Sequence, residues 1–118
     1  MEFNNSEPIY LQITRYIMFQ IMSGELVSGQ KLPSVRELAV ALQTNPNTIQ
    51  RAFAELEAKD VVYTKKGLGR FVTEDETVIT YLRKQMIQGE VSAFIQKLLG
   101  LGFTKEEIIA LIEDYQGE

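Results

Sequence analysis

The sequence contains no cysteine and no histidine. Their absence excludes disulfide bonds, thiolate nucleophiles and imidazole bases, and it removes the ligands of the usual zinc sites. An enzyme of this composition would depend on carboxylates, lysines or hydroxyls alone. We therefore expect a protein that is not an enzyme, with no catalytic residue, no cofactor and no bound metal.

Long apolar runs are also missing, since no segment approaches the roughly 18 residues that a membrane-spanning helix needs. Residues 1–8 are polar and acidic, and they show neither the basic start nor the apolar stretch of a signal peptide. A cytoplasmic protein without membrane contact is the expectation that follows.

The net charge of −4 hides an uneven distribution of charged residues. Residues 31–72 carry seven basic and four acidic side chains, a net charge of +3, whereas residues 73–118 carry four basic and nine acidic ones, a net charge of −5. A nucleic-acid-binding part joined to an acidic part would show this asymmetry, although a chance distribution of solvated charges would also produce it.

Three helices are predicted in the first half of the chain. Isoleucine recurs every fourth residue within residues 8–23, which predicts an amphipathic helix. The run Ser34-Val35-Arg36-Glu37 has the spacing of a capping box and predicts a short helix that ends near Leu42. Asn45 and Pro46 suit the N-cap and first position of the next helix. The buried face of that helix is expected to consist of Ile49, Ala52, Phe53 and Leu56, with Ala58 as a further candidate.

A basic hairpin and an apolar tail are predicted to follow. Residues 61–63 and 71–73 are typical of strands, and the glycine-containing basic run 65–70 between them predicts a tight turn. A long helix then extends to about residue 99, and a second capping box at residues 104–107 begins another helix.

Two short helices followed by a hairpin are the plan of a winged helix-turn-helix. We predict an α+β, mostly α fold, with a winged helix-turn-helix DNA-binding domain over residues 1–75 and a two-helix C-terminal dimerisation tail over residues 76–118. The first turns of the second helix would lie in the major groove, where side chains read base edges or bind phosphates. The candidate DNA-binding residues from this pattern are Asn47, Thr48, Gln50 and Arg51 in that helix, Arg36 before it, and Lys65, Lys66 and Arg70 in the hairpin.

Three segments closely resemble the GntR family of bacterial transcription regulators. They are Leu32-Pro33-Ser34-Val35-Arg36-Glu37-Leu38-Ala39, the run from Asn45-Pro46-Asn47-Thr48 to Leu56-Glu57, and Gly67-Leu68-Gly69-Arg70-Phe71-Val72. The opening Pro8-Ile9-Tyr10-Leu11-Gln12-Ile13 and the short tail are similar to the YtrA-like subfamily.

The resemblance implies a function and adds to the candidate residues. It implies that Arg36 contacts phosphate, that Asn45 contacts the operator together with the other residues at the start of the recognition helix, and that Gly67 and Lys66 contact the groove. YtrA-like members carry a two-helix dimerisation part and often repress operons for ABC transporters. Where the family's wing usually has threonine, this chain has Arg70, which either strengthens wing binding or points to solvent.

Several alternatives stay open at this stage. Arg36 could form an ion pair with Glu37 or Glu55 instead of contacting DNA. Ser34 is expected to act as a helix cap and is also a candidate DNA contact. Tyr63 and Phe71 are expected in the core of the wing base. For the whole chain, the alternative function is a winged-helix protein-interaction module without DNA affinity.

The tail is predicted to form a homodimer interface, because two helices bury little apolar surface by themselves. The candidate interface residues are Leu82, Met86, Phe94 and Leu98. The expected partners are therefore double-stranded operator DNA and a second copy of the chain, and no residue pattern indicates a small-molecule effector.

Overall fold

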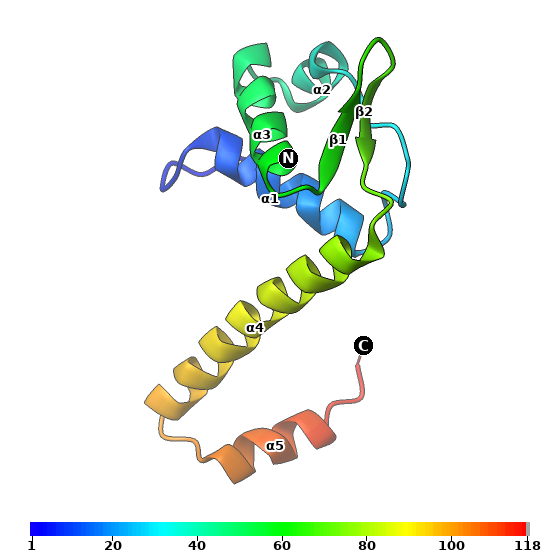
Figure 1. Cartoon of the computed structure of the whole chain (residues 1–118). Helices are drawn as coiled ribbons and strands as arrows, with labels where there is room; N and C mark the ends of the chain where they lie inside the picture. The colour runs from blue at the N-terminus through cyan, green and yellow to red at the C-terminus, as the bar shows by residue number, and fades with distance from the viewer. Residues whose placement is uncertain (118) are drawn as a thin grey trace. The chain divides into compact units, whose positions relative to one another are not determined.

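A computed structural model describes residues 1–117 of the chain (Figure 1). Its contacts divide the chain into two compact units, Met1–Tyr81 and Leu82–Glu118, which we call the winged unit and the tail unit. The element order is α1 (Ile9–Met22), α2 (Val35–Leu42), α3 (Pro46–Ala58), β1 (Val62–Lys65), β2 (Gly69–Val72), α4 (Glu76–Gly100) and α5 (Lys105–Glu113). The predicted fold class, a winged helix-turn-helix followed by two C-terminal helices, is confirmed.

The core of the winged unit lies where α1, α3 and the base of the hairpin meet. Each of these elements contributes side chains according to its own period, every third or fourth residue from the helices and alternate residues from the strands. The four predicted core positions of α3 are fully buried. Ala58, at the end of the helix, is exposed, so its prediction as a core residue was wrong. The largest fully buried side chains are Phe53, Ile13, Ile49, Leu56, Val61, Val62 and Val72.

Local capping signals fix the first residues of α2 and α3. The Ser34 hydroxyl accepts a hydrogen bond from the Glu37 N–H, and the Glu37 carboxylate accepts one from the Ser34 N–H, so the predicted capping box is present. The Asn45 side chain accepts a hydrogen bond from the Asn47 N–H, and Pro46 occupies the first turn of α3. These caps place the start of α3 immediately after the turn that ends α2.

Asp60 ends α3 with a left-handed backbone conformation, at a φ of 60°. In this conformation the Val61 N–H reaches the Leu56 carbonyl oxygen and the Asp60 N–H reaches that of Glu57, which is the hydrogen-bonding pattern of a Schellman motif. Glycine is the usual residue at such a position, but aspartate tolerates it better than most. The motif turns the chain from α3 directly into β1.

We expect Ser34→Ala to lower the free energy of unfolding by about 1 kcal/mol, because it leaves the Glu37 N–H without its capping partner. Urea denaturation of the wild type and the variant measures the difference. Ser34→Thr, which keeps a capping hydroxyl, is the matched control and should lose much less stability. Equal stability of Ser34→Ala and the wild type would show that the cap contributes nothing.

The hairpin pairs β1 and β2 in antiparallel register, with Tyr63 opposite Phe71 and Thr64 opposite Arg70. The segment before α2 extends this small sheet, because the Leu32 N–H donates to the Arg70 carbonyl oxygen and Lys31 forms an isolated bridge with Phe71. Thr64 and Arg70 lie on the face of the hairpin that faces α3, because both bond the Glu57 carboxylate, and Tyr63 and Phe71 lie on the other face.

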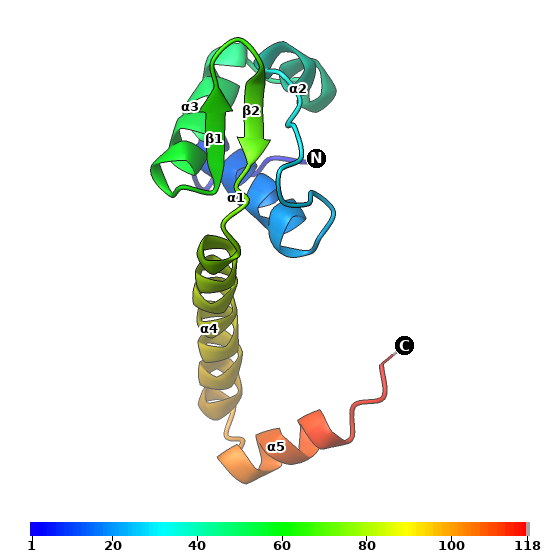
Figure 2. The ribbon, with the colours of Figure 1, turned by 45° about the vertical axis from the view of Figure 1, so that its right-hand side comes forward.

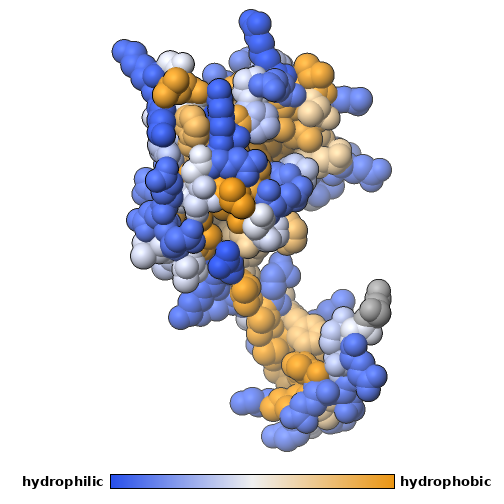
Figure 3. Space-filling view, turned by 90° about the vertical axis from the view of Figure 1, so that its right-hand side faces the viewer, coloured by the Kyte–Doolittle hydropathy of each residue, from blue (hydrophilic) through white to orange (hydrophobic). Residues whose placement is uncertain are grey.

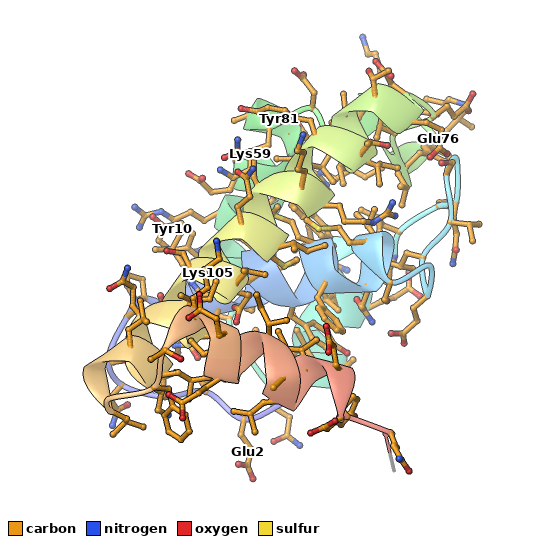
Figure 4. All side chains as sticks on the ribbon, turned by 90° about the horizontal axis from the view of Figure 1, so that it is seen from below. Glu2, Tyr10, Lys59, Glu76, Tyr81 and Lys105 are labelled. Carbon is orange, nitrogen blue, oxygen red and sulfur yellow. The ribbon has the colours of Figure 1, made fainter. Side chains whose placement is uncertain are left out.

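The first turn of α4 belongs to the winged unit. Ile79 is buried there, and the Ser28 hydroxyl donates to the Glu76 carboxylate at 2.5 Å. Figure 4 shows Glu76 beside the loop that follows α1. These contacts join the beginning of α4 to the winged unit, and the division between the two units follows Tyr81.

The tail unit buries very little of its apolar surface. Gly102, at a φ of 94°, ends the turn after α4, and the Thr104–Glu107 capping box begins α5 as predicted. Ile108 is 4% exposed, but most apolar side chains of this unit remain accessible (Figure 3). No helix in residues 1–117 is both long enough and apolar enough to cross a membrane.

Candidate nucleic-acid interface

The first two turns of α3 carry polar side chains and no acidic one. Asn47, Gln50 and Arg51 are exposed, and Thr48 is half-buried. Asn45 is exposed as well, although its side-chain oxygen is occupied by the capping hydrogen bond. This surface presents amide, hydroxyl and guanidinium groups together with free N–H groups of a helix N-terminus, a combination suited to base edges and phosphates.

Arg36 lies on α2 next to this surface. It is exposed, and no ion pair joins it to Glu37 or Glu55 within the residues that the structure describes. The alternative interpretation of Arg36 as an ion-pair partner was therefore wrong. Its neighbours form a shallow concave surface between α2 and the start of α3, lined by Ala39, Val40, Gln43, Thr44, Asn45 and Pro46.

The hairpin tip supplies a second basic surface. Lys65, Lys66 and Gly67 are all exposed there, and Gly67 has a φ of 80°, which a residue with a side chain rarely adopts. A side chain at Gly67 would meet open space, so the backbone conformation and not crowding requires glycine at this position.

Lys65 is partly held by the aromatic face of the wing. Its ammonium lies 4.7 Å from the centroid of the Phe71 ring and 5.6 Å from that of Tyr63. These two rings stack with their centroids 5.9 Å apart and are each half-buried. The rings therefore form the outer face of the wing base and orient Lys65, whereas Lys66 has no such contact with an aromatic ring of residues 1–117.

Arg70 does not point to solvent, so that part of the sequence-based alternative was wrong. Its Nε donates to the Glu57 carboxylate at 2.8 Å, and its Nη2 donates to the Gln50 amide oxygen at 3.1 Å. The guanidinium also lies 4.9 Å from the centroid of the Phe53 ring. Arg70 thus joins the wing to α3, a role that its place in the wing motif did not indicate.

Arg51 has an aromatic partner that the sequence analysis missed. Its guanidinium carbon lies 4.0 Å from the centroid of the Tyr10 ring, which belongs to the first turn of α1 and is labelled in Figure 4. A stacked guanidinium keeps its N–H groups free for hydrogen bonds in the plane of the group. Tyr10 therefore positions Arg51 without occupying its donors.

These surfaces meet at one end of the winged unit. Figures 1 and 2 both show the wing tip, α2 and the first turn of α3 at the same end, with the last turn of α3 at the other. Within the described residues the structure thus brings together the predicted contacts Ser34, Arg36, Asn45, Asn47, Thr48, Gln50, Arg51, Lys65, Lys66 and Gly67.

The four predicted interface residues of the tail lie along α4. Leu82, Met86 and Leu98 are half-buried, and Phe94 is 46% exposed. Phe94 is accompanied by other apolar side chains of the tail unit that are between 44% and 59% exposed: Ile87, Val91, Leu99, Ile109, Leu111 and Ile112.

The hydrogen bond from Arg70 makes the stability of the fold depend on pH. This hydrogen bond is the main reason why the pKa of Glu57 lies below its usual range. Partial burial of the carboxylate raises the pKa, and the hydrogen bond from the Thr64 hydroxyl lowers it further. Because the folded-state pKa is lowered, Glu57 stabilises the fold above its unfolded-state pKa of about 4.3, and this stabilisation is lost as the pH falls through the folded-state value.

We expect the free energy of unfolding to fall more steeply between about pH 6 and about pH 3 in the wild type than in Glu57→Gln, which cannot titrate. Urea denaturation at a series of pH values measures both slopes. Glu55→Gln, which removes a half-buried carboxylate of the same helix that forms no ion pair with the described residues, is the control and should keep the wild-type slope. Identical slopes for Glu57→Gln and the wild type would contradict a stabilising Glu57–Arg70 pair.

The chain matches a known family and is similar to curated proteins along most of its length. Residues 9–72 match the family of bacterial regulatory proteins described as the gntR family. The chain is 39% identical to the uncharacterised HTH-type transcriptional regulator YhcF of Bacillus subtilis, covering 97% of this chain and 94% of that protein. It is 36% identical to the HTH-type transcriptional repressor YtrA of the same organism, covering 77% of this chain and 71% of that protein.

Solved structures agree with these matches. A GntR family transcriptional regulator from Listeria monocytogenes aligns with a TM-score of 0.88 at 44% identity, over 97% of this chain and 100% of that one. The DNA-binding domain of AraR, solved in complex with its operator ORX1, aligns with a TM-score of 0.57 at 27% identity, over 61% of this chain and 93% of that one. The chain therefore belongs to the GntR family of bacterial regulatory proteins, which are DNA-binding transcription regulators and not enzymes.

Proposed function

We propose that the chain is a sequence-specific repressor that binds a palindromic operator as a homodimer. The observation that carries this proposal is the start of α3, which is exposed, has no acidic side chain in its first turn, and lies beside Arg36 and the basic wing tip. The AraR complex with operator DNA and the repressor YtrA support it, since both are similar to this chain. Such a repressor would act in the cytoplasm, where bacterial operator DNA lies.

The tail unit supports the homodimer. Seven large apolar side chains of the tail are about half exposed, including Phe94 at 46%. Exposed apolar surface of this kind marks an interaction site, and most homo-oligomers are two-fold symmetric dimers. Two copies of α3 related by a two-fold axis would read two inverted half-sites, with centres about 34 Å apart or a modest multiple of that distance. Residues 76–118 would then form the dimerisation tail, and residues 1–75 the DNA-binding domain.

The residues at the interface divide into three groups by the contact each would make. Arg36, Lys65 and Lys66 would bind phosphates, since charged groups without base contacts position the protein on the duplex. Asn47, Thr48, Gln50 and Arg51 would reach base edges from the first two turns of α3. Ser34, Asn45 and Gly67 would approach the DNA backbone, the first two mainly as helix caps.

An electrophoretic shift with the promoter region upstream of the chain's own gene tests the proposal. We expect a discrete complex that unlabelled promoter DNA displaces and scrambled DNA of the same length does not. Binding to neither DNA would favour the alternative function, a winged-helix protein-interaction module. The similarity to YtrA-like regulators further suggests that the regulated target is a transporter operon. If it is, transcripts of the neighbouring transporter operon should increase in a strain from which the gene for this chain has been deleted.

Lys66→Ala is expected to weaken binding to every DNA sequence and to reduce the slope of log K against log salt concentration by about 0.9, the value for one lost phosphate contact. Titrations between about 50 mM and about 200 mM salt measure the slope. Lys59→Ala, which removes an exposed lysine from the far end of α3, is the matched control and should leave the slope unchanged. An unchanged slope for Lys66→Ala would exclude Lys66 as a phosphate contact.

A further inference from the structure

Arg70 connects the wing to a side chain that is expected to read DNA. The Arg70–Thr64 cross-strand pair faces α3, and both side chains bond the same Glu57 oxygen at 2.8 Å. Gln50, Phe53 and Glu57 lie on one face of α3, at intervals of three and four residues, and all three contact the Arg70 guanidinium. The Arg70 side chain is only 27% exposed.

This contact fixes the orientation of the Gln50 amide. A guanidinium only donates hydrogen bonds, so the Gln50 atom that lies 3.1 Å from Arg70 Nη2 must be the amide oxygen. The amide nitrogen, with its two N–H donors, is then the group on the side of this exposed side chain that Arg70 does not contact, while the oxygen keeps one lone pair beside the guanidinium.

The bases differ in what they require from such a side chain. Adenine is read by glutamine through a pair of bonds, in which the amide oxygen accepts from N6 and the amide nitrogen donates to N7. Guanine instead offers two acceptors, O6 and N7, on its major-groove edge. The Gln50 amide oxygen already accepts from Arg70, so the amide offers its donors to guanine, whereas the adenine pair would require the same oxygen to accept a second hydrogen bond, from N6, beside the guanidinium.

We propose that Arg70 is a positioning residue that makes Gln50 a donor and thereby sets a preference for guanine over adenine at the base that Gln50 contacts. The inference rests on the proposed function, since it requires α3 to read DNA. It assigns to Arg70 a role in specificity that acts through Gln50, in place of the direct DNA contact expected from the sequence. Glu57 accepts from the Nε of the same guanidinium at 2.8 Å, which holds Arg70 in the orientation that reaches Gln50.

Selection of binding sites from a random pool of double-stranded DNA tests the inference. The wild-type chain, Gln50→Ala, Arg70→Thr and Arg70→Met are each used, and the enriched sites are sequenced. Gln50→Ala identifies the base position that Gln50 reads, because preference is lost there. Arg70→Met keeps an apolar stem over Phe53 while removing every donor, and circular dichroism melting confirms that each variant is folded.

We expect the wild type to prefer guanine at the Gln50 position, and both Arg70 variants to shift the ratio of guanine to adenine by about tenfold toward adenine, with preferences elsewhere in the site unchanged. A role of Arg70 in stability alone would lower affinity at every position without changing that ratio. Adenine preferred by the wild type, or an unchanged ratio in Arg70→Met, would overturn the inference and leave the proposed function intact. No enriched sequence with the wild type would overturn both.

Discussion

Phe94→Asp is expected to make the chain monomeric and to lower its affinity for a palindromic operator by about a hundredfold or more. A charge in the middle of the apolar surface of the tail unit would oppose association of two copies. Each monomer would then bind one half-site alone and would lose the gain of roughly 10² to 10⁴ that linked binding of two sites provides.

Sedimentation velocity gives the oligomeric state of Phe94→Asp, and an electrophoretic shift gives its affinity. Phe94→Leu keeps an apolar side chain and should remain dimeric. Gln96→Asp adds the same charge at an exposed position two residues along α4, on a different side of the helix, and should also remain dimeric. A dimeric Phe94→Asp with wild-type affinity would contradict the assignment of the tail as the dimer interface.

Arg51→Ala is expected to reduce operator affinity by about tenfold to a hundredfold while changing the affinity for random DNA only a few-fold. A guanidinium that binds a base in two places contributes discrimination of about 1 to 3 kcal/mol, and the stacked Tyr10 ring holds Arg51 in one orientation for it. Non-specific affinity depends mainly on the number of phosphate contacts and should change by one charge at most.

Arg51→Lys separates the two contributions, because it keeps the positive charge and loses the planar group of donors. It should bind random DNA as the wild type does and still lose most of the preference for the operator. Fluorescence anisotropy with operator and scrambled duplexes at one fixed salt concentration measures both affinities. Equal losses on the two DNAs for Arg51→Ala would make Arg51 a phosphate contact and not a base contact.

The features that could be predicted from the sequence are those with local causes. The capping box at Ser34, the Asn45–Pro46 helix start and the capping box at Thr104 each depend on residues within four positions of one another. The left-handed Asp60 and the period of the apolar side chains in α3 are local in the same sense. These signals locate the helix-turn-helix and the exposed start of α3.

The features that were missed depend on how the elements pack. Arg70 reaches Glu57 and Gln50, which lie 13 and 20 residues away, only because the hairpin lies against α3. The stacking of Arg51 on Tyr10 likewise joins α3 to the first turn of α1. The wing motif therefore indicates only DNA or solvent as the environment of Arg70, and it does not reveal the contact of this side chain with α3.

Mapping of backbone amide chemical shifts by NMR during titration with operator DNA tests the central claim most directly, that the start of α3 and the wing tip contact DNA. We predict the largest shifts at residues 45–51 and 65–67 and at Arg36, with the last turn of α3 little affected. Shifts confined to α4 and α5, or no shifts at an excess of DNA, would contradict this account of the interface.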